Sequence, residues 1–279
     1  MHRVRARRCL TRHAFNAAAG AAALCLLAAG CTTSPTGRRQ IILVSAPEMN
    51  RLGDQAFAQL RQKTPVSRNA RATRFVECVA RHVTAAAKAG YRWQVTLFQS
   101  PEANAFALPG GKIGVYTGLL KYARTQGELA AVIGHEVGHV VARHMDARVS
   151  AEMLTGLGLQ AVDKAIGGAG TTHDQVMSAL GLGAQVGVLL PYSRSQENEA
   201  DIIGLDYMAL AGFDPRDAVT LWRNMAKAGS EPPVFLSDHP SGASRIRDLE
   251  SHMPQALDEY RRARATGRKP DCGTAPATG

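Results

Sequence analysis

Apolar residues recur along most of the chain at the three- and four-residue spacing of amphipathic helices. Ser45 and Glu48 form a capping pattern that predicts a helix ending near Gln62. A second helical pattern runs from about Asn69 to Lys88. The same spacing predicts further helices over about 194–211, 215–228, 242–252 and 254–265.

The period of the pattern changes to two in the middle of the chain. Residues 93–99 and 112–117 alternate as β-strands do, and turn residues end the segment 104–111 between them. We therefore expect an α+β fold, mostly α-helical, with a small β-hairpin sheet.

The helix expected after this sheet is apolar on nearly every side over residues 129–141, which predicts that it is buried. It begins at a capping box over 125–128 and is expected to continue to about Arg148. Residues 151–190 are rich in Gly, Ala and Leu, and we expect either a helical pair that acts as a lid or a membrane-facing flap, or a core hairpin.

The N-terminus has the pattern of a signal peptide. Residues 1–13 are basic, and the uncharged run from Ala14 to Gly30 is shorter than the roughly 20 apolar residues of a membrane span. The small residues before Cys31 resemble a bacterial lipobox, in which this cysteine receives the lipid and becomes the mature N-terminus. The alternatives are an ordinary cleaved signal with a chance cysteine and a plain transmembrane anchor.

The lipobox interpretation divides the chain into segments. Thr32 stands where an Asp commonly holds bacterial lipoproteins in the inner membrane, so we expect the protein at the periplasmic face of the outer membrane. The expected segments are a signal peptide over 1–30, a lipidated N-terminus and tether over 31–44, a folded domain over 45–265 and a frayed C-terminal tail over 266–279.

Cysteine usage agrees with export. Cys9 and Cys25 leave with the signal peptide and Cys31 carries the lipid, so Cys78 and Cys272 remain. In an oxidising compartment these two cysteines either form one disulfide, which would attach the tail to an early helix, or stay as two thiols.

The charge excludes one class of function. The chain carries a formal charge of +10, and five of its arginines lie in residues 1–13 and leave with the signal peptide. The remaining charge of +5 is spread without a basic run, and aromatic residues make up only 5% of the chain. A dedicated nucleic-acid-binding protein is therefore not expected.

The buried helix carries a metal-binding pattern. His135 and His139 are four residues apart, which on a helix places them about 40° from each other and one turn along, so both imidazoles can reach one ion. Glu136 can face a metal-bound water and take its proton. The alternative is a pair of core histidines bonded to carbonyls, which is costly because the carboxylate would also be buried.

A zinc site that hydrolyses peptides needs a third protein ligand. One class of enzyme takes a Gly and a third His farther along the same segment, but those positions hold Ala142 and Met145 here. His144 is one residue away and points about 180° from His135 on a continuous helix, so we expect it at the surface or in a cap.

The other solution is a carboxylate from a separate helix. Glu197 and Asp201 are four residues apart and share a face, so one can bind zinc while the other orients a ligand histidine. Glu199 lies about 200° around from Glu197, so only one of these two can face the metal. A solvated acidic face is the alternative.

These patterns together resemble the HtpX and CAAX-prenyl-protease-like family of gluzincin zinc metallopeptidases, in its bacterial lipoprotein branch. The resemblance implies a zincin-like metallopeptidase domain over 45–265 with one Zn²⁺ per chain. It also implies that His135, His139 and Glu197 bind the zinc and that Asp201 orients a ligand. The matching segments are the zinc motif over 134–139, a second motif over 193–201, an edge strand over 104–120 and a His-Pro segment over 238–246.

The same resemblance suggests the catalytic roles. Glu136 would act as the general base on a zinc-bound water and then hand the proton to the leaving amine. His239 and Arg245, which the resemblance places at the cleft, are candidate donors to the oxyanion, and Tyr192 is a weaker one. For His239 two alternatives stay open: a fourth zinc ligand that keeps the enzyme latent, and a structural His-Pro turn.

Substrate recognition is expected at the sheet, where an extended peptide can pair with a strand without demanding a particular sequence. The function expected is therefore a zinc-dependent endopeptidase whose partners are unfolded or misassembled envelope proteins and, through the lipid, the membrane. Two other classes stay open: a catalytically latent chaperone or binding module, and a structural envelope lipoprotein. The residues expected to contact the substrate are Lys112, Ile113, Gly114, Val115 and Tyr116.

Overall fold

The computed structural model describes residues 31–154, 192–227, 233–239 and 244–276. The predicted signal peptide and most of the Gly-, Ala- and Leu-rich segment lie outside these residues. The chain divides into two compact units, one that ends at Leu43 and one that begins at Val44. In the first unit, β1 (Cys31–Thr33) pairs antiparallel with β2 (Arg39–Ile41), and Cys31 is exposed.

The second unit is built mainly from helices, and the expected α+β, mostly helical fold is confirmed. The helix that was predicted to begin at residues 125–128 starts with a reciprocal capping box between Thr125 and Glu128. Ser193 and Gln196 form another such box at the start of the helix over 194–211. The two helices expected near the C-terminus are one helix that continues through Pro254. The helices are α2 (Ala46–Lys63), α3 (Ala70–Ala87), α4 (Gln126–Val141), α7 (Arg194–Ala211), α8 (Arg216–Ala226), α9 (Val234–Asp238) and α10 (Arg245–Ala265), with a 3-10 turn at Thr117–Lys121.

The sheet of this unit has three strands, β3 (Gln94–Phe98), β4 (Ala105–Leu108) and β5 (Lys112–Tyr116), in the order β3-β5-β4. The hairpin joins β4 and β5, and β3 runs parallel to β5. The alternation in the sequence predicts strands over 93–99 and 112–117 and a turn at the end of residues 104–111, and the structure adds β4 just before that turn as the hairpin partner of β5. Only the last two residues of that segment, Gly110 and Gly111, have the positive φ angles of a tight turn.

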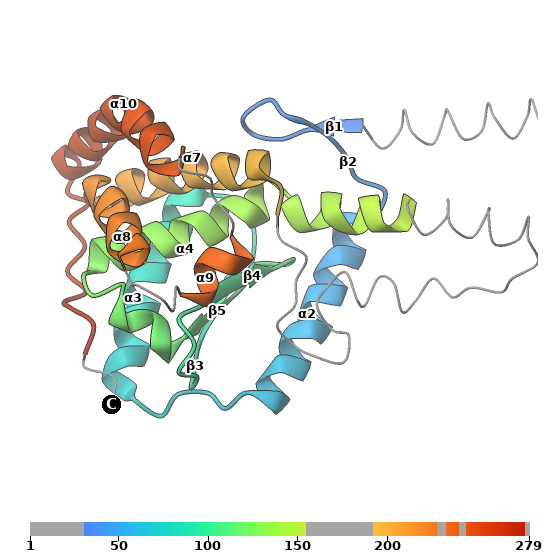
Figure 1. Ribbon diagram of the computed structural model, residues 1–279, viewed down its shortest axis with the longest axis horizontal. Coiled ribbons are helices and arrows are strands. Elements are labelled where there is room, and N and C mark those ends of the chain that lie inside the picture. The colour runs from blue at the N-terminus through green and yellow to red at the C-terminus, as the bar shows by residue number, and fades with distance from the viewer. Residues whose placement is uncertain (1–30, 155–191, 228–232, 240–243, 277–279) are drawn as a thin grey trace, which may run out of the picture. The chain divides into compact units, whose positions relative to one another are not determined.

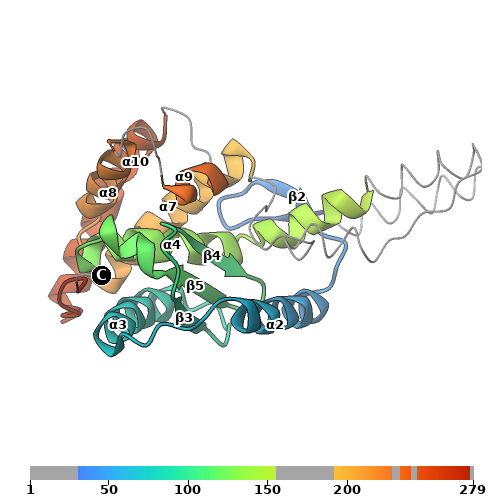
Figure 2. The same cartoon turned by 60° about the horizontal axis from the view of Figure 1, so that its bottom comes forward.

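Helix α4 runs through the centre of the second unit (Figure 1), where it packs along α7 and also contacts α3, α8 and β4. Every residue from Gly127 to Val140 is buried, as the apolar pattern predicted. Figure 2 shows α2 and α3 on the side of the sheet opposite α8 and α10. Among the described residues, every helix is too short or too polar to span a bilayer.

Three glycines, Gly134, Gly138 and Gly204, set the distance between α4 and α7. A Cβ atom on Gly204 would lie 2.6 Å from the carbonyl carbon of Gly134 and 2.6 Å from the backbone nitrogen of His135. A Cβ atom on Gly138 would lie 2.8 Å from the carbonyl oxygen of Ala200. The two backbones are therefore in direct contact, which brings the first turns of α7 beside the histidines of α4.

The C-terminal segment is attached to the domain, in contrast to the frayed tail that the sequence predicted. Cys78 of α3 and Cys272 form a disulfide. Thr274 pairs with Thr125 in an isolated bridge, and the Gln126 side chain bonds the backbone of Cys272 at 2.8 Å. These contacts hold the end of the described chain against the start of α4.

The central helix ends earlier than predicted. It stops at Val141, and after two turn residues a second helical stretch occupies residues 144–154. Arg143 has a left-handed backbone with φ of 56°, and its Nε donates to Asp146 Oδ2 at 2.7 Å. Because the chain changes direction there, His144 does not keep the orientation that a straight helix would give it.

Candidate metal centre

Four side chains converge in the second unit on one buried point. His135 and His139 come from α4, Glu197 from the first turn of α7, and His239 from the residue after α9. Their nearest ligand atoms all lie within 4.8 Å of one another. Each residue is at most 4% exposed, so this is an enclosed cluster of nitrogen and oxygen ligands.

The shortest distances centre on His135. Its Nε2 lies 3.0 Å from Nε2 of His139 and 3.1 Å from Nδ1 of His239. The carboxylate of Glu197 lies 3.3 Å from His135 Nε2, 3.5 Å from His139 Nε2 and 3.2 Å from His239 Nδ1. One ion could therefore contact all four residues after small shifts of the side chains.

The structure also distinguishes the two carboxylates that the sequence left as alternatives. Glu197 faces the cluster, whereas Asp201 lies behind it and bonds His135 Nδ1 through Oδ1 at 2.8 Å. Arg245 joins the two, because its Nε donates to Asp201 at 2.6 Å and its Nη2 donates to Glu197 at 2.7 Å. Its guanidinium also lies over the ring of Trp222, 4.0 Å from the centroid.

His144 corrects a prediction. It was expected at the surface or in a cap, but its side chain is fully buried and its Nδ1 lies 2.9 Å from Nδ1 of His139. Its Nε2 lies 3.0 Å from the carboxylate of Glu199. Glu199 does point away from the metal ligands, as predicted, but it points to His144. The spacing of both residues was visible in the sequence, and the turn at Arg143 that brings them together was not.

The hydrogen bonds of the two helical histidines test whether a cation fits. A neutral imidazole that donates from Nδ1 carries a lone pair on Nε2. Asp201 accepts from His135 Nδ1, and the bond with His144 occupies Nδ1 of His139. Two Nε2 lone pairs would then face each other at 3.0 Å, next to a carboxylate. A positive charge between the rings stabilises such an arrangement, and nitrogen and carboxylate ligands suit zinc.

The charges of the cluster shift the pKa values of its members. Burial lowers the pKa of His139 well below its usual value, and the neighbouring charge of His135 lowers it further. Burial alone would lower the pKa of His135, but Asp201 and Glu197 raise it to about 9. Burial would raise the pKa of Glu197, yet its hydrogen bonds with His135 and His239 hold it far below the usual range. His139 is thus a neutral ligand and Glu197 a negative one.

Glu136 lies beside the cluster and is 1% exposed. Burial raises the pKa of its carboxyl, while His239, His135 and a hydrogen bond from the backbone of Ala107 lower it. Within the described residues, Oε1 of Glu136 has no hydrogen-bond partner, and His239 Nε2 lies 3.4 Å away. A buried carboxylate oxygen with no donor of its own is placed to receive a proton from a reactant.

Comparison with known proteins assigns this arrangement to a family. The model of peptidase family M48 matches residues 67–253, which include all four residues of the cluster and most of the described domain. The chain belongs to peptidase family M48. Members of this family are metallopeptidases that use zinc, which agrees with the chemistry of the ligands.

Individual relatives cover part of the same region. The mitochondrial metalloendopeptidase OMA1 of Arabidopsis thaliana is 42% identical over 181 residues, 63% of this chain and 35% of the relative. The protein of that name from Schizosaccharomyces pombe is 39% identical over 59% of this chain and 48% of its own. The β-barrel assembly-enhancing protease of Escherichia coli is 29% identical over 73% of this chain and 43% of its own. The chain thus spans half or less of each of these relatives.

The three other candidate residues that the sequence selected also lie at the M48 site. His239 contributes Nδ1 to the cluster and directs Nε2 toward Glu136. The Arg245 guanidinium uses two nitrogens for Glu197 and Asp201, and its Nη1 is buried with no partner among the described residues. The Tyr192 ring packs against His139 in a tilted arrangement, with ring centroids 4.1 Å apart.

The strand predicted to bind substrate is not at an edge. Strand β5 lies between β3 and β4, so the backbone groups of residues 112–116 are already paired, and the prediction of Lys112, Ile113, Gly114, Val115 and Tyr116 as the contact strand is wrong. The edge next to α4 is β4. Because Tyr116 donates to the carbonyl of Asn104, the alternation of an antiparallel ladder directs the backbone groups of Ala105 and Ala107 outward.

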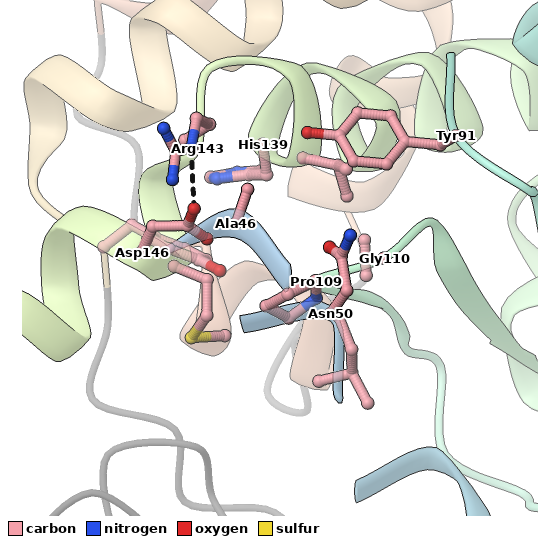
Figure 3. Close-up of a pocket in the computed structure, with 13 residues that line it drawn as sticks. Ala46, Asn50, Tyr91, Pro109, Gly110, His139, Arg143 and Asp146 are labelled. Carbon is pink, nitrogen blue, oxygen red and sulfur yellow. Dashed lines mark hydrogen bonds and ion pairs between the residues drawn. The ribbon is translucent and has the colours of Figure 1, made fainter. Parts of the chain in front are cut away.

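A pocket adjoins the M48 site on the side of His139 (Figure 3). It lies between the start of α2, the turn after β4 and the break that follows α4. The bond between Arg143 and Asp146 forms one of its walls. The labelled lining residues are Ala46, Asn50, Tyr91, Pro109, Gly110, His139, Arg143 and Asp146.

Proposed function

We propose that this M48 peptidase is a zinc-dependent endopeptidase that cleaves unfolded or misassembled proteins of the bacterial envelope. The observation that carries the proposal is the meeting of His135, His139 and Glu197 at one buried point with Glu136 beside them. A purely structural protein would have no use for a buried carboxylate oxygen without a donor next to a set of metal ligands.

Each residue of the site has a separate role in the proposed hydrolysis. His135, His139 and Glu197 would hold the zinc, which supplies Lewis acidity toward water and the scissile carbonyl. Glu136 accepts a proton from the attacking water as the new carbon–oxygen bond forms, and it gives that proton to the amine as the carbon–nitrogen bond breaks. Arg245 acts as a positioning residue, because it holds the carboxylates of Glu197 and Asp201 in place.

Strand β4 would bind the substrate. The outward backbone groups of Ala105 and Ala107 lie at the edge beside Glu136, to which Ala107 already donates. An extended peptide that pairs with this edge brings its backbone next to the metal ligands without any demand on its sequence. This mode of binding suits unfolded chains, whose backbone groups are unpaired.

The place of action remains part of the proposal. We propose that the protein belongs to the bacterial lipoprotein branch of the HtpX and CAAX-prenyl-protease-like enzymes and is attached by a lipid on Cys31 to the periplasmic face of the outer membrane. The basic and apolar N-terminal pattern supports this, as does the E. coli relative named for β-barrel assembly. The relatives named as mitochondrial share the peptidase region with it.

His239 supports a second candidate function. As a fourth ligand within 4.8 Å of the other three, it would occupy the position that a reacting water needs. The protein would then be a latent binding module or chaperone until His239 moves. In the first proposal the same residue would instead donate to the oxyanion through the nitrogen that now faces Glu136.

A Glu136→Gln variant tests the main proposal. It should keep zinc, because Glu136 is not a ligand, and it should lose about 10²–10⁴-fold in cleavage of casein or an unfolded protein, because the general base is gone. The control is Glu102→Gln, at an exposed glutamate, which should cleave normally. Cleavage by Glu136→Gln at the wild-type rate would remove the general-base role. Full cellular function without any cleavage would favour the binding module.

A further inference from the structure

A second histidine–carboxylate pair lies beyond the metal ligands. His144 is fully buried and Glu199 is 5% exposed, yet neither belongs to the ligand cluster or to the proposed chemical steps. Burial of an imidazole and a carboxylate is costly unless they serve each other or a third group. Here His144 bonds both the carboxylate of Glu199 and the imidazole of His139, so the pair contacts a metal ligand.

The directions of the hydrogen bonds follow from the carboxylate. An ionised Glu199 can only accept, so His144 donates to it from Nε2 across 3.0 Å. A neutral His144 then carries a lone pair on Nδ1, which accepts from Nδ1–H of His139 across 2.9 Å. The lone pair of His139 is thereby left on Nε2, the atom that faces the cluster.

The two helical ligands are therefore held in different ways. His135 donates directly to the carboxylate of Asp201, whereas His139 reaches the carboxylate of Glu199 through His144. Both carboxylates lie on α7, two residues apart and on different faces. A partner of this kind fixes the tautomer and the ring orientation of a metal-bound histidine and raises its basicity.

The break after α4 makes this contact possible. A continuous helix would point His144 away from the cluster, but the left-handed conformation of Arg143 turns the next residue back toward His139. Tyr192 covers another side of the His139 ring. The imidazole is thus fixed by a ring packed against it and by one hydrogen bond at Nδ1.

We propose that His144 and Glu199 are positioning residues that hold His139 in the tautomer and orientation in which it binds the metal. The inference rests on the proposed zinc site, but it concerns the affinity for zinc and not the chemical step. It predicts that a hydrogen-bond acceptor at the place of His144 Nδ1 affects the zinc affinity more than the volume of the side chain does.

The test measures zinc affinity by competition with a chelator, on the full mature chain. His144→Ala should weaken binding by about 10–100-fold, the usual effect of removing such a partner. His144→Asn should stay within a few-fold of wild type, because its amide oxygen can accept from His139 where the imidazole nitrogen did. Glu199→Gln keeps an acceptor and should bind well, while Glu199→Leu should bind less tightly.

A matched control is His252→Ala. His252 of α10 pairs with Asp206 at 2.8 Å, and this carboxylate, like that of Glu199, lies on α7. The pair has no contact with the metal ligands in the described part of the chain. The zinc affinity of His252→Ala should be unchanged. Urea unfolding of each metal-free variant identifies proteins that fail to fold. If His144→Ala or Glu199→Leu fails to fold, the His144→Asn and Glu199→Gln variants still test the inference.

Two results would overturn the inference. One is a folded His144→Ala variant that binds zinc as tightly as wild type. The other is an equal loss in His144→Ala and His144→Asn, since the hydrogen bond would then not be what matters. If Glu136→Gln still cleaved substrate, the proposed function would fail, but the affinities would still decide the role of His144.

Discussion

The backbone of one residue decides the surroundings of a metal ligand. Arg143 has a φ of 56°, a left-handed backbone conformation that costs a residue with a Cβ atom roughly 1–2 kcal/mol. This conformation ends α4 and returns His144 to His139. Strained backbone of this kind persists only where the surrounding structure imposes it. The bond between Arg143 and Asp146 is one such contact.

We predict that Arg143→Gly is more stable than Arg143→Ala by about 1 kcal/mol, because glycine adopts positive φ without strain. Both variants lack the bond to Asp146, so the difference isolates the backbone. Urea denaturation measures it. At the exposed helical position Arg61 the order should reverse, with Ala more stable than Gly by about 1 kcal/mol. The same order at both positions would contradict the prediction.

At the scale of elements, the site depends on how closely α4 and α7 approach. The two histidines and the carboxylate lie on separate helices, so their distance is set by the packing at Gly134, Gly138 and Gly204. Glu197 lies seven residues before Gly204, about two helical turns away. A change at the glycine contact is therefore expected to reach the metal ligands.

Gly204→Ala should weaken zinc binding and reduce stability by about 1–3 kcal/mol. The added Cβ would lie 2.6 Å from backbone atoms of Gly134 and His135, which cannot rotate away, so α7 has to move. Chelator competition and thermal unfolding measure the two effects. Asn198→Ala, at an exposed position of the same helix, should change neither. Wild-type zinc affinity in Gly204→Ala would show that the helices can separate without moving Glu197.

At the scale of the whole molecule, the C-terminal segment is joined to α3, an early helix of the second unit. The disulfide between Cys78 and Cys272 spans 194 residues, and the segment after it bonds the start of α4. A cross-link over so long a loop stabilises mainly by restricting the unfolded chain. The element that it reaches is the helix that carries both histidine ligands.

The double variant Cys78→Ser/Cys272→Ser should lose about 2–5 kcal/mol of stability. Chemical denaturation of the mature protein measures the loss. A reductant should lower the midpoint of the wild type to that of the double variant and should leave the double variant unchanged. A wild-type midpoint that does not respond to complete reduction would show that the disulfide adds nothing to stability.

Local rules were sufficient for much of the fold. Caps at Ser45, Asn69, Thr125 and Ser193 begin helices where the sequence predicted them, because a side chain that bonds the first turn depends on residues three apart. The same locality placed His135 and His139 side by side, since helix geometry alone brings residues four apart together.

Contacts between distant segments needed the tertiary structure. The pairing of β3 with β5, the break at Arg143 and the face that His144 presents all depend on packing across the domain, and short-range patterns carry no information about it. The sequence by itself determined which residue types could hold a metal and activate water. Only the folded chain decided that Glu197 faces the two histidines, that Asp201 and His144 support them, and that β4 is an edge strand of the sheet, because each depends on how closely separate elements pack.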